Sequence, residues 1–431
     1  MTQRPLSVSL PRFATHTTAE EAIKGAKVVA TKKIRFYPEN KQGYEEALAL
    51  YRRSYNIAVE LINNGKDFVD GKKFDIRPQI RSQVAAEQEE NGRIYNNELP
   101  NEAVREATDK LKAVIKKNKS LAKQGAKSGY ASLGFKSRKG VVHTFNFPKF
   151  PKGKNIAIKA LGRVTLTEEL PAECFMKACK VTRDKGRWFL QVQQLIDIKP
   201  EIQGDVNVVA IDPGVRTFAT AFSPNEALVI GDGFAQEKLF PLMKKVDNLI
   251  SMEQKIINKV RGLEGEPQWA KERLIHLERE INRLKCRKDD LITDLHNRTA
   301  FELVNRYDVI FLPTFETKGM VRRKGSKVRT IRRNTCRQML DLNHYGFKQK
   351  LKWMAKKHGK MVVDVNEAYT SKTQTWDGQI NPKLKGQKTL KNGNLRIDRD
   401  INGSRNVLIK SLQGSLDLEH NITANVAIGA L

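Results

Sequence analysis

The first residue with chemistry to explain is Asp212, which ends an apolar run. Residues 206–211 (VNVVAI) predict a buried strand, and a Pro-Gly turn and a second β-rich run follow the acid. A carboxylate at the end of a buried strand is costly unless a cation meets it. The pattern therefore indicates a metal ion beside Asp212, provided that the chain supplies further carboxylates.

Four other acids lie close to predicted element ends. Glu316 and Glu367 follow strands, and Asp398 and Asp400 precede a helix. Two-metal hydrolysis of a phosphodiester needs carboxylates that hold cations ~4 Å apart, and these carboxylates can come from distant parts of a sequence. Mg²⁺ prefers such oxygen ligands. Helix N-capping is the alternative role for Asp398 and Asp400, and taken alone it is the simpler one.

A large positive charge favours a nucleic-acid partner. The chain has 78 Lys and Arg against 48 Asp and Glu, a net charge of +30, which predicts a polyanion as ligand. A membrane surface is the alternative, but no basic amphipathic helix with bulky aromatics stands out. Aromatic residues make up only 7%, so backbone contacts are favoured over base stacking.

The densest basic segment spans 318–360, where almost no acid balances the charge. Such runs are often only solvated faces, but the overall charge favours contacts with phosphates here. The residues predicted to bind nucleic acid are Arg322, Arg323, Lys324, Lys327, Arg329, Arg332, Arg333, Arg337 and Lys348.

Hydrophobic periodicity outlines the elements that position these residues. The predicted strands are 28–37, 141–148, 156–159, 163–166, 178–182, 187–194, 307–312 and 360–365, with a tight hairpin at 184–186. The predicted helices are about 41–64, 101–119 with Asn101 as N-cap, 242–260, 274–295, 344–354 and 407–412.

The 431 residues predict two or three domains. The expected segments are a disordered leader at 1–25, a β-rich half at 26–200 with a helical insert at about 41–130, a second half at 205–412 with a helical hairpin at about 235–300, and a tail at 413–431.

Other features point to an intracellular protein. No apolar run approaches the ~20 residues of a membrane span, and the first thirty residues contain no apolar segment of the signal-peptide type. The four cysteines are too scattered for a disulfide framework and are expected to be reduced thiols. They are Cys174, Cys179, Cys286 and Cys336.

Four motifs in order carry a family resemblance. DPGVRTF (212–218), LPTFETKGM (312–320), NEAYTSKT (366–373) and DRDINGSRN (398–406) resemble the split RuvC-type nuclease of transposon-encoded TnpB proteins. They most resemble the eukaryotic and viral relatives, the Fanzor proteins. The resemblance covers essentially the whole chain, although the N-terminal half matches only in layout.

The resemblance implies an α/β RNase H-like nuclease domain and an N-terminal wedge-like β-barrel interrupted by a helical recognition region. It implies a guide RNA and double-stranded target DNA as partners, cut beside a short adjacent motif. The particle would be a monomeric ribonucleoprotein, nuclear in a eukaryotic host and cytoplasmic otherwise.

By resemblance Asp212 is the first acid and Asp400 the last, with Asp398 a structural neighbour. TnpB proteins carry the middle glutamate where this chain has Pro313, which cannot bind a metal. The Fanzor pattern moves this role to Glu367, so Asp212, Glu367 and Asp400 would hold two Mg²⁺ ions, with Mn²⁺ as the alternative metal. Glu316 is the alternative middle acid.

Relatives also carry paired Cys-x-x-Cys motifs that form a zinc ribbon between the last two acids. The matching segment, about 370–396, contains no cysteine. Structural zinc needs four Cys or His ligands, so no zinc is expected.

Three functions follow from these observations. The leading hypothesis is a Mg²⁺-dependent, RNA-guided DNA endonuclease of a mobile element. The missing ribbon and displaced glutamate motivate a cleavage-defective, guide-dependent DNA-binding protein as the second. A transposase acting in DNA transposition is the third, although none of the seven histidines forms the His-x-His pair of single-strand transposases.

Overall fold

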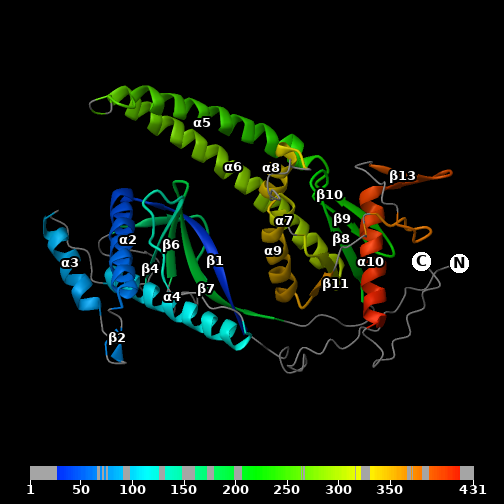
Figure 1. The fold of residues 1–431 in the computed structure, drawn as a ribbon, viewed down its shortest axis with the longest axis horizontal. Coiled ribbons are helices and arrows are strands. Elements are labelled where there is room, and N and C mark those ends of the chain that lie inside the picture. The colour runs from blue at the N-terminus through cyan, green and yellow to red at the C-terminus, as the bar shows by residue number, and fades with distance from the viewer. Residues whose placement is uncertain are drawn as a thin grey trace. The chain divides into compact units, whose positions relative to one another are not determined.

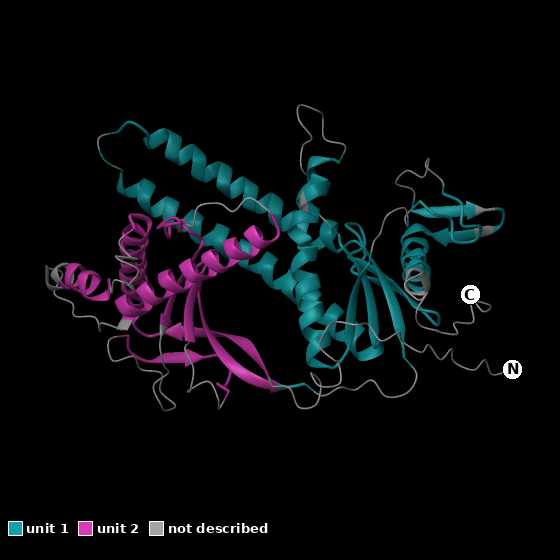
Figure 2. Cartoon of the chain, turned by 60° about the horizontal axis from the view of Figure 1, so that its bottom comes forward, with its two compact units in different colours: residues 1–27, 197–431 teal, residues 28–196 magenta. Residues whose placement is uncertain are grey.

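The structure is a computed structural model that describes most of the chain. The described residues are 27–65, 68–69, 72–73, 76–90, 98–125, 132–147, 161–171, 179–198, 206–263, 265, 267–315, 317–321, 331–365, 370, 372–380 and 388–417. The predicted leader, the strand at 156–159 and the chain after 417 lie outside them. The chain divides into one compact unit of residues 28–196 and another of residues 1–27 and 197–431 (Figure 2).

A mixed five-stranded sheet forms the centre of the unit at 197–431. Its strand order is β10-β9-β8-β11-β12, in which β8, β9 and β10 pair antiparallel and β8, β11 and β12 pair parallel. The strands are β8 (Val208–Pro213), β9 (Ala219–Phe222), β10 (Ala227–Ile230), β11 (Val309–Pro313) and β12 (Met361–Val365). The mixed sheet with helices that the resemblance implies is confirmed.

Helices cover both faces of this sheet because β8 is apolar on both sides (Figure 1). Val209 and Ile211 contribute to a core that also holds residues of α6 (Gln268–Arg306) and α9 (His344–Lys357). Val208 and Ala210 share a core with Val407 of α10 (Arg399–Asp417). Successive side chains of a strand point to opposite faces, so one short run fills two cores.

Three helices of this unit lie where the periodicity predicts them, at 242–260, 274–295 and 344–354, whereas the helix predicted at 407–412 begins at Arg399. The leucine stripe at 274–295 lies in α6, which packs beside α5 as a helical hairpin (Figure 1). The elements are η2 (Ala235–Leu239), α5 (Phe240–Val260), α6 (Gln268–Arg306), α7 (Thr317–Val321), α8 (Arg333–Leu342), α9 (His344–Lys357) and α10 (Arg399–Asp417), with a small hairpin of β13 (Thr389–Asn392) and β14 (Leu395–Asp398).

The unit at 28–196 contains a second five-stranded sheet, in the order β4-β6-β7-β1-β5. Its elements are β1 (Lys27–Pro38), α2 (Lys41–Asn63), β2 (Phe68–Val69), β3 (Lys72–Lys73), α3 (Arg77–Glu90), α4 (Glu98–Lys123), β4 (Val142–Phe147), β5 (Val164–Leu166), β6 (Cys179–Asp184) and β7 (Arg187–Asp197). Closure of this sheet into a wedge-like barrel stays a prediction.

Two local predictions in this unit have clear outcomes. The hairpin at 184–186 is confirmed, because Lys185 and Gly186 both have positive φ between β6 and β7, as a two-residue hairpin turn requires. The predicted N-cap at Asn101 is wrong, because α4 begins at Glu98. Pro100 lies in the first turn of the helix, where its missing N–H leaves no helical hydrogen bond unmade.

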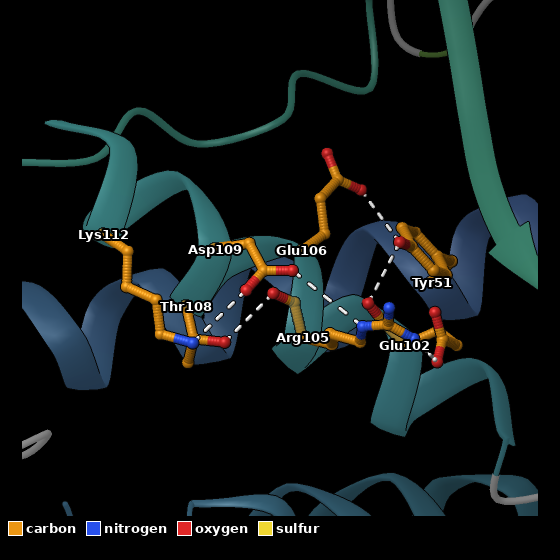
Figure 3. Close-up of polar contacts among 7 residues, drawn as sticks. All are labelled: Tyr51, Glu102, Arg105, Glu106, Thr108, Asp109 and Lys112. Carbon is orange, nitrogen blue, oxygen red and sulfur yellow. Dashed lines mark hydrogen bonds and ion pairs between the residues drawn. The ribbon is translucent and has the colours of Figure 1, made fainter. Parts of the chain in front are cut away.

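A buried ionic cluster joins α2 to α4. The hydroxyl of Tyr51 donates to the Glu102 carbonyl at 3.2 Å and to the Glu106 carboxylate at 2.8 Å (Figure 3). Lys110 and Lys136 each place Nζ 2.7 Å from Glu106. Burial raises the pKa of Glu106, but the hydrogen bonds from the two lysines outweigh it and lower the pKa to about 2. One carboxylate thus pairs with two cations.

Among the described residues, no helix combines the length and the apolar character needed to cross a bilayer.

We expect Glu106→Gln to destabilise the unit at 28–196. The change leaves Lys110 and Lys136 without their shared carboxylate, and because this ion cluster is only partly buried, the loss should be roughly 1 to 3 kcal/mol. Denaturant unfolding of the full chain measures the loss.

The matched control is Asp109→Asn on the same helix, since Asp109 is exposed and pairs only with surface cations (Figure 3). It should change the stability by less than about 0.5 kcal/mol. Equal losses in the two variants would show that the buried cluster has no special role.

Candidate active site

A cavity of about 400 Å³ lies at the end of β8. Asp212 lines it from the strand, residues 213–217 line it from the turn that follows, and Arg399 and Asp400 line it from the first turn of α10. Phe315 and Met320 line the apolar side of this cavity. The two acids predicted as first and last members of the site therefore face one space.

The parallel strands explain why this edge of the sheet gathers functional residues. Phe311 of β11 pairs with Ala210 of β8, and continuing this register by two residues brings Pro313 beside Asp212. Pro313 in turn pairs with Val365, the last residue of β12. The carboxyl ends of all three strands meet at one edge, which is the usual location of a ligand site in such sheets.

Both candidates for the middle acid follow, in the sequence, a strand that ends at this edge. Glu367 follows the end of β12 by two residues, and Glu316 follows the end of β11 by three. Both acids lie outside the described residues. The identity of the middle acid therefore stays a prediction.

Two glycines allow the backbone to come close at this site. A Cβ atom on Gly214 would lie 2.6 Å from the Thr217 carbonyl oxygen, so the Pro-Gly turn accepts no side chain there. A Cβ atom on Gly403 would lie 2.5 Å from Oδ2 of Asp212. Helix α10 thus passes directly against the Asp212 carboxylate, and Asp400 lies three residues earlier, on the same helix face.

The start of α10 corrects one prediction and separates two acids. The predicted helix began at 407, whereas α10 begins at Arg399. Oδ1 of Asp398 accepts from the Asp400 N–H at 2.8 Å and from the Ile401 N–H at 3.4 Å, so the capping alternative is right for Asp398. Asp400 instead sits in the first helical turn and lines the cavity. The sequence missed this start because Ile401 is the one apolar residue with a large side chain in DRDINGSRN, so no helical periodicity marks the segment.

The charge around Asp400 favours a bound cation. Burial raises the pKa of Asp400, and the nearby Asp398 and Asp232 raise it further, while Arg399 and Arg216 oppose them. A divalent cation would relieve this cost, and carboxylate oxygens suit Mg²⁺. Among the described residues, no three His, Cys, Asp or Glu side chains gather closely enough to hold a metal. The described part of the site thus supplies a two-carboxylate donor set.

Asp232 is a site residue that the sequence did not indicate. Thr217 donates its hydroxyl to Asp232 at 3.0 Å, and Lys388 Nζ lies 3.6 Å from the same carboxylate. Thr217 belongs to the turn after Asp212, so this contact ties the turn to the loop after β10. Asp232 stands between two loop glycines, where no periodicity marks it.

Two buried asparagines of α10 hold a neighbouring segment in place. Asn402 accepts from the Thr375 N–H at 3.0 Å and donates to the Thr373 carbonyl at 2.8 Å. Asn406 donates to the carbonyls of Thr370 at 2.9 Å and Thr373 at 2.7 Å. The helix that carries Asp400 therefore also fixes the segment that follows Glu367 in the sequence.

A stack of three rings supports the turn after Asp212. His344 stacks on Phe218 with ring centroids 5.0 Å apart, and Phe218 stacks on His296 at 5.4 Å. Nε2 of His344 donates to the Gly214 carbonyl, and Nε2 of His296 donates to the Leu342 carbonyl, both at 2.9 Å. Burial lowers the pKa of each histidine to about 4, so both rings are neutral at pH 7.

The predicted nucleic-acid contacts are only partly described. Arg322, Arg323, Lys324, Lys327 and Arg329 lie outside the described residues. Arg332 and Arg333 are exposed at the start of α8. Arg337 pairs with Asp247 at 2.9 Å, and Lys348 pairs with Asp364 at 3.0 Å, so carboxylates of the chain itself neutralise these two cations. Their role in binding nucleic acid stays a prediction.

Comparisons with known proteins agree with this layout. A family model described as "Cas12f1-like, TNB domain" matches residues 344–407, which include Asp400. The chain is 27% identical over 427 residues to "Putative transposase A625R" of Paramecium bursaria Chlorella virus 1, covering 92% of this chain and 90% of the relative. It is 29% identical over 214 residues to "TnpB-like protein L79" of Acanthamoeba polyphaga mimivirus, covering 49% of this chain and 38% of that protein.

A solved Cas12f1 structure in complex with sgRNA and target DNA aligns over 88% of this chain and 98% of its own, with 13% identity and a TM-score of 0.41. That score is too low to establish a shared fold. The resemblance to TnpB proteins is confirmed by the family match and the named relatives. The Fanzor branch is not distinguished by these matches and stays a prediction.

We expect Asp398→Ala and Asp400→Asn to change stability in opposite directions. Asp398→Ala removes the cap of α10 and should cost about 1 kcal/mol. Asp400→Asn removes a buried negative charge that faces other acids, so it should raise the free energy of unfolding in metal-free buffer. Urea unfolding with a chelator present measures both.

Asp398 precedes α10 and Asp400 lies two residues later in its first turn, so each variant serves as the control for the other. Destabilisation by Asp400→Asn would show that its charge is already compensated.

The ring stack predicts a loss of stability in mild acid. The folded-state pKa values of His296 and His344 are about 4, below the ordinary 6.5. As the pH falls, the unfolded chain therefore takes up protons first, and stability present above pH 6.5 is lost toward pH 4. We expect a loss on the order of 2 kcal/mol across this window, measured by urea titrations at several pH values.

His344→Gln should flatten this pH dependence, because glutamine can still donate to Gly214 but does not titrate. His276→Gln is the control, since His276 is exposed on α6, and it should leave the slope unchanged. An unchanged slope in His344→Gln would exclude His344 as the source.

Proposed function

We propose that this TnpB-family protein is an RNA-guided DNA endonuclease of a mobile element, which hydrolyses phosphodiester bonds with two metal ions. The observation that carries the proposal is the convergence of Asp212 and Asp400 on one cavity at the carboxyl edge of a mixed sheet. Arg216 and Arg399 line the same cavity. Paired acids beside two arginines suit a site where metal ions and a phosphate meet.

The relatives support the reaction class. One is named a putative transposase and matches almost the full length of the chain, and another is named TnpB-like. The strand order and directions of the sheet around β8 suit the RNase H-like assignment that the motifs imply. Enzymes of that kind cut nucleic-acid backbones with acids at strand and helix ends.

Each residue has a defined task in this proposal. Asp212 and Asp400 bind the cations, with Glu367 as the third acid and Glu316 as its alternative. Bound Mg²⁺, or Mn²⁺ in its place, would activate the attacking water and stabilise the leaving 3′-oxygen. Arg216 is exposed at the cavity, where it neutralises the charge of an incoming phosphate. No zinc is assigned to the segment at 370–396.

The positioning of the acids comes from the rest of the site. Gly403 lets α10 approach Asp212, Asp398 fixes the start of the helix, and His344 holds the carbonyl of Gly214. These contacts fix the two carboxylates before substrate binds, which avoids paying for their ordering during the reaction.

The proposed partners are a guide RNA and a double-stranded DNA target, bound by a monomeric ribonucleoprotein inside the cell. A transposase acting on DNA ends is the second candidate, favoured by the name of the full-length relative. A cleavage-defective, guide-dependent DNA-binding protein differs from the leading proposal only in the chemistry at Asp212 and Asp400.

We expect Asp212→Ala to abolish cleavage and to leave RNA binding intact. Loss of a carboxylate that holds the metals should slow hydrolysis by roughly 1000-fold or more. The measurement uses ribonucleoprotein purified with its RNA, Mg²⁺, and duplex DNA that matches the RNA. Cleavage is followed on a gel, and the co-purified RNA is quantified in parallel.

Asp294→Ala is the control, since Asp294 is exposed on α6 and pairs only with Arg298. The same assay with Glu367→Gln and Glu316→Gln identifies the middle acid. Cleavage by Asp212→Ala at the normal rate would refute the assignment of this acid. If the wild type retains matched DNA without cutting it, the result supports the cleavage-defective binding protein. If the wild type joins DNA ends, the result supports the transposase.

A further inference from the structure

Four basic side chains gather in the unit at 28–196 with little negative charge among them. They are Arg52 on α2, Arg138 in the segment before β4, His143 on β4 and Arg183 on β6. This set is called the arginine cluster below. None of its members belongs to the basic segment at 318–360.

The segment at 132–138 lies along α2 because two asparagines bind its backbone. Asn63 exchanges two 3.0 Å hydrogen bonds with the N–H and carbonyl of Leu133. Asn56 does the same with Lys136, at 2.8 and 3.1 Å. The segment therefore runs antiparallel to α2. Arg138 follows Lys136 by two residues, which places it beside the turn of α2 that carries Arg52.

The sheet brings the other two members to the same place. His143 of β4 pairs directly with Arg183 of β6. Alternation along the strand puts His143 on the same sheet face as Phe145, and the Phe145 ring lies 6.5 Å from the ring of Tyr51 on α2. The pair thus faces the helix that carries Arg52.

The positive charge of the cluster is only partly balanced. Arg183 lies 3.5 Å from Glu45, while its Nε is buried without a hydrogen-bond partner among the described residues. Within the described part of the chain, neither Arg52 nor Arg138 has a carboxylate within ion-pair distance. The charges of Arg52 and Arg138 repel each other, so folding alone does not explain this arrangement.

The pKa values report the same excess. Burial lowers the pKa of Arg52, and the charge of Arg138 lowers it further. Burial also lowers the pKa of His143, followed by the charges of Arg52 and Arg183. Lys110 near Tyr51 shows the contrast, because its ion pair with Glu106 raises its pKa despite burial.

We propose that the arginine cluster binds a backbone phosphate of nucleic acid. Guanidinium groups pair with phosphate oxygens through two parallel hydrogen bonds, and an anion would supply the missing negative charge. Arg138 is exposed and Arg183 half-buried, so a phosphate can reach the cluster from solvent. The net charge of +30 favours nucleic acid over an acidic protein as the source of the anion.

The experiment compares two adjacent charge reversals in the full-length protein. Arg138→Glu changes the cluster, whereas Lys139→Glu makes the same charge change at an exposed residue outside it. The probes are a fluorescent 20-nucleotide single-stranded RNA and a fluorescent 20-base-pair DNA of unrelated sequence. Fluorescence anisotropy gives the Kd at several salt concentrations, and circular dichroism confirms folding.

We expect Arg138→Glu to weaken binding by about 10-fold or more and to reduce the slope of log K against log salt by about 1. Lys139→Glu should weaken binding by less than about 3-fold, through long-range charge alone. Arg52→Ala supplies a second variant, and it should reproduce the loss.

The outcomes separate the possible sources of the phosphate. Loss on RNA alone assigns the cluster to RNA, loss on DNA alone assigns it to DNA, and loss on both assigns it to the shared backbone. The proposal is overturned if Arg138→Glu and Lys139→Glu have equal effects on the Kd and leave the salt slope unchanged. It is also overturned if Arg138→Glu weakens binding of an acidic peptide but leaves the Kd for both nucleic acids unchanged. The proposal does not rest on cleavage, because the assay measures only binding.

Discussion

The contact between the Asp212 carboxylate and the backbone of α10 at Gly403 is the constraint on which the site depends. A side chain at residue 403 would collide with the acid, so the end of β8 and the first turns of α10 can come together only through glycine. This approach brings Asp400 to the same cavity as Asp212. It also places two negative charges near each other, which leaves the site needing a cation.

Helix α10 serves the site with each of its faces. Asp400 and Gly403 meet the end of β8, Val407 packs under the sheet, and Asn402 and Asn406 hold the segment at 370–375. Since an α-helix is rigid, movement of any one of these contacts would shift the others. Its cap at Asp398 therefore matters for the position of the acids as well as for the stability of the helix.

Partly buried charges are balanced within the fold at one place and left unbalanced at two others. Glu106 pairs with two lysines within the fold, whereas the arginine cluster and the Asp400 site each keep charge of one sign that the chain does not fully balance. Unbalanced charge opposes folding, so it is expected mainly where a ligand supplies the opposite sign. On this reasoning the acidic site is fitted to cations and the arginine cluster to phosphate.

The sequence by itself determined the local features: the strand ending at Asp212, the glycine turn after it, the hairpin at 184–186 and the helices of α5 and α6, because each depends on periodicity or backbone conformation within a few residues. It also suggested that Asp212 and Asp400 act together, through a motif resemblance. Tertiary structure alone decided that Asp398 caps α10 while Asp400 lines the cavity. It also decided that Asp232 holds Thr217 of the turn after Asp212, and that Arg52, Arg138 and Arg183 belong to one cluster. Such contacts join residues far apart in the chain, and only the packing of helices on sheets brings them together.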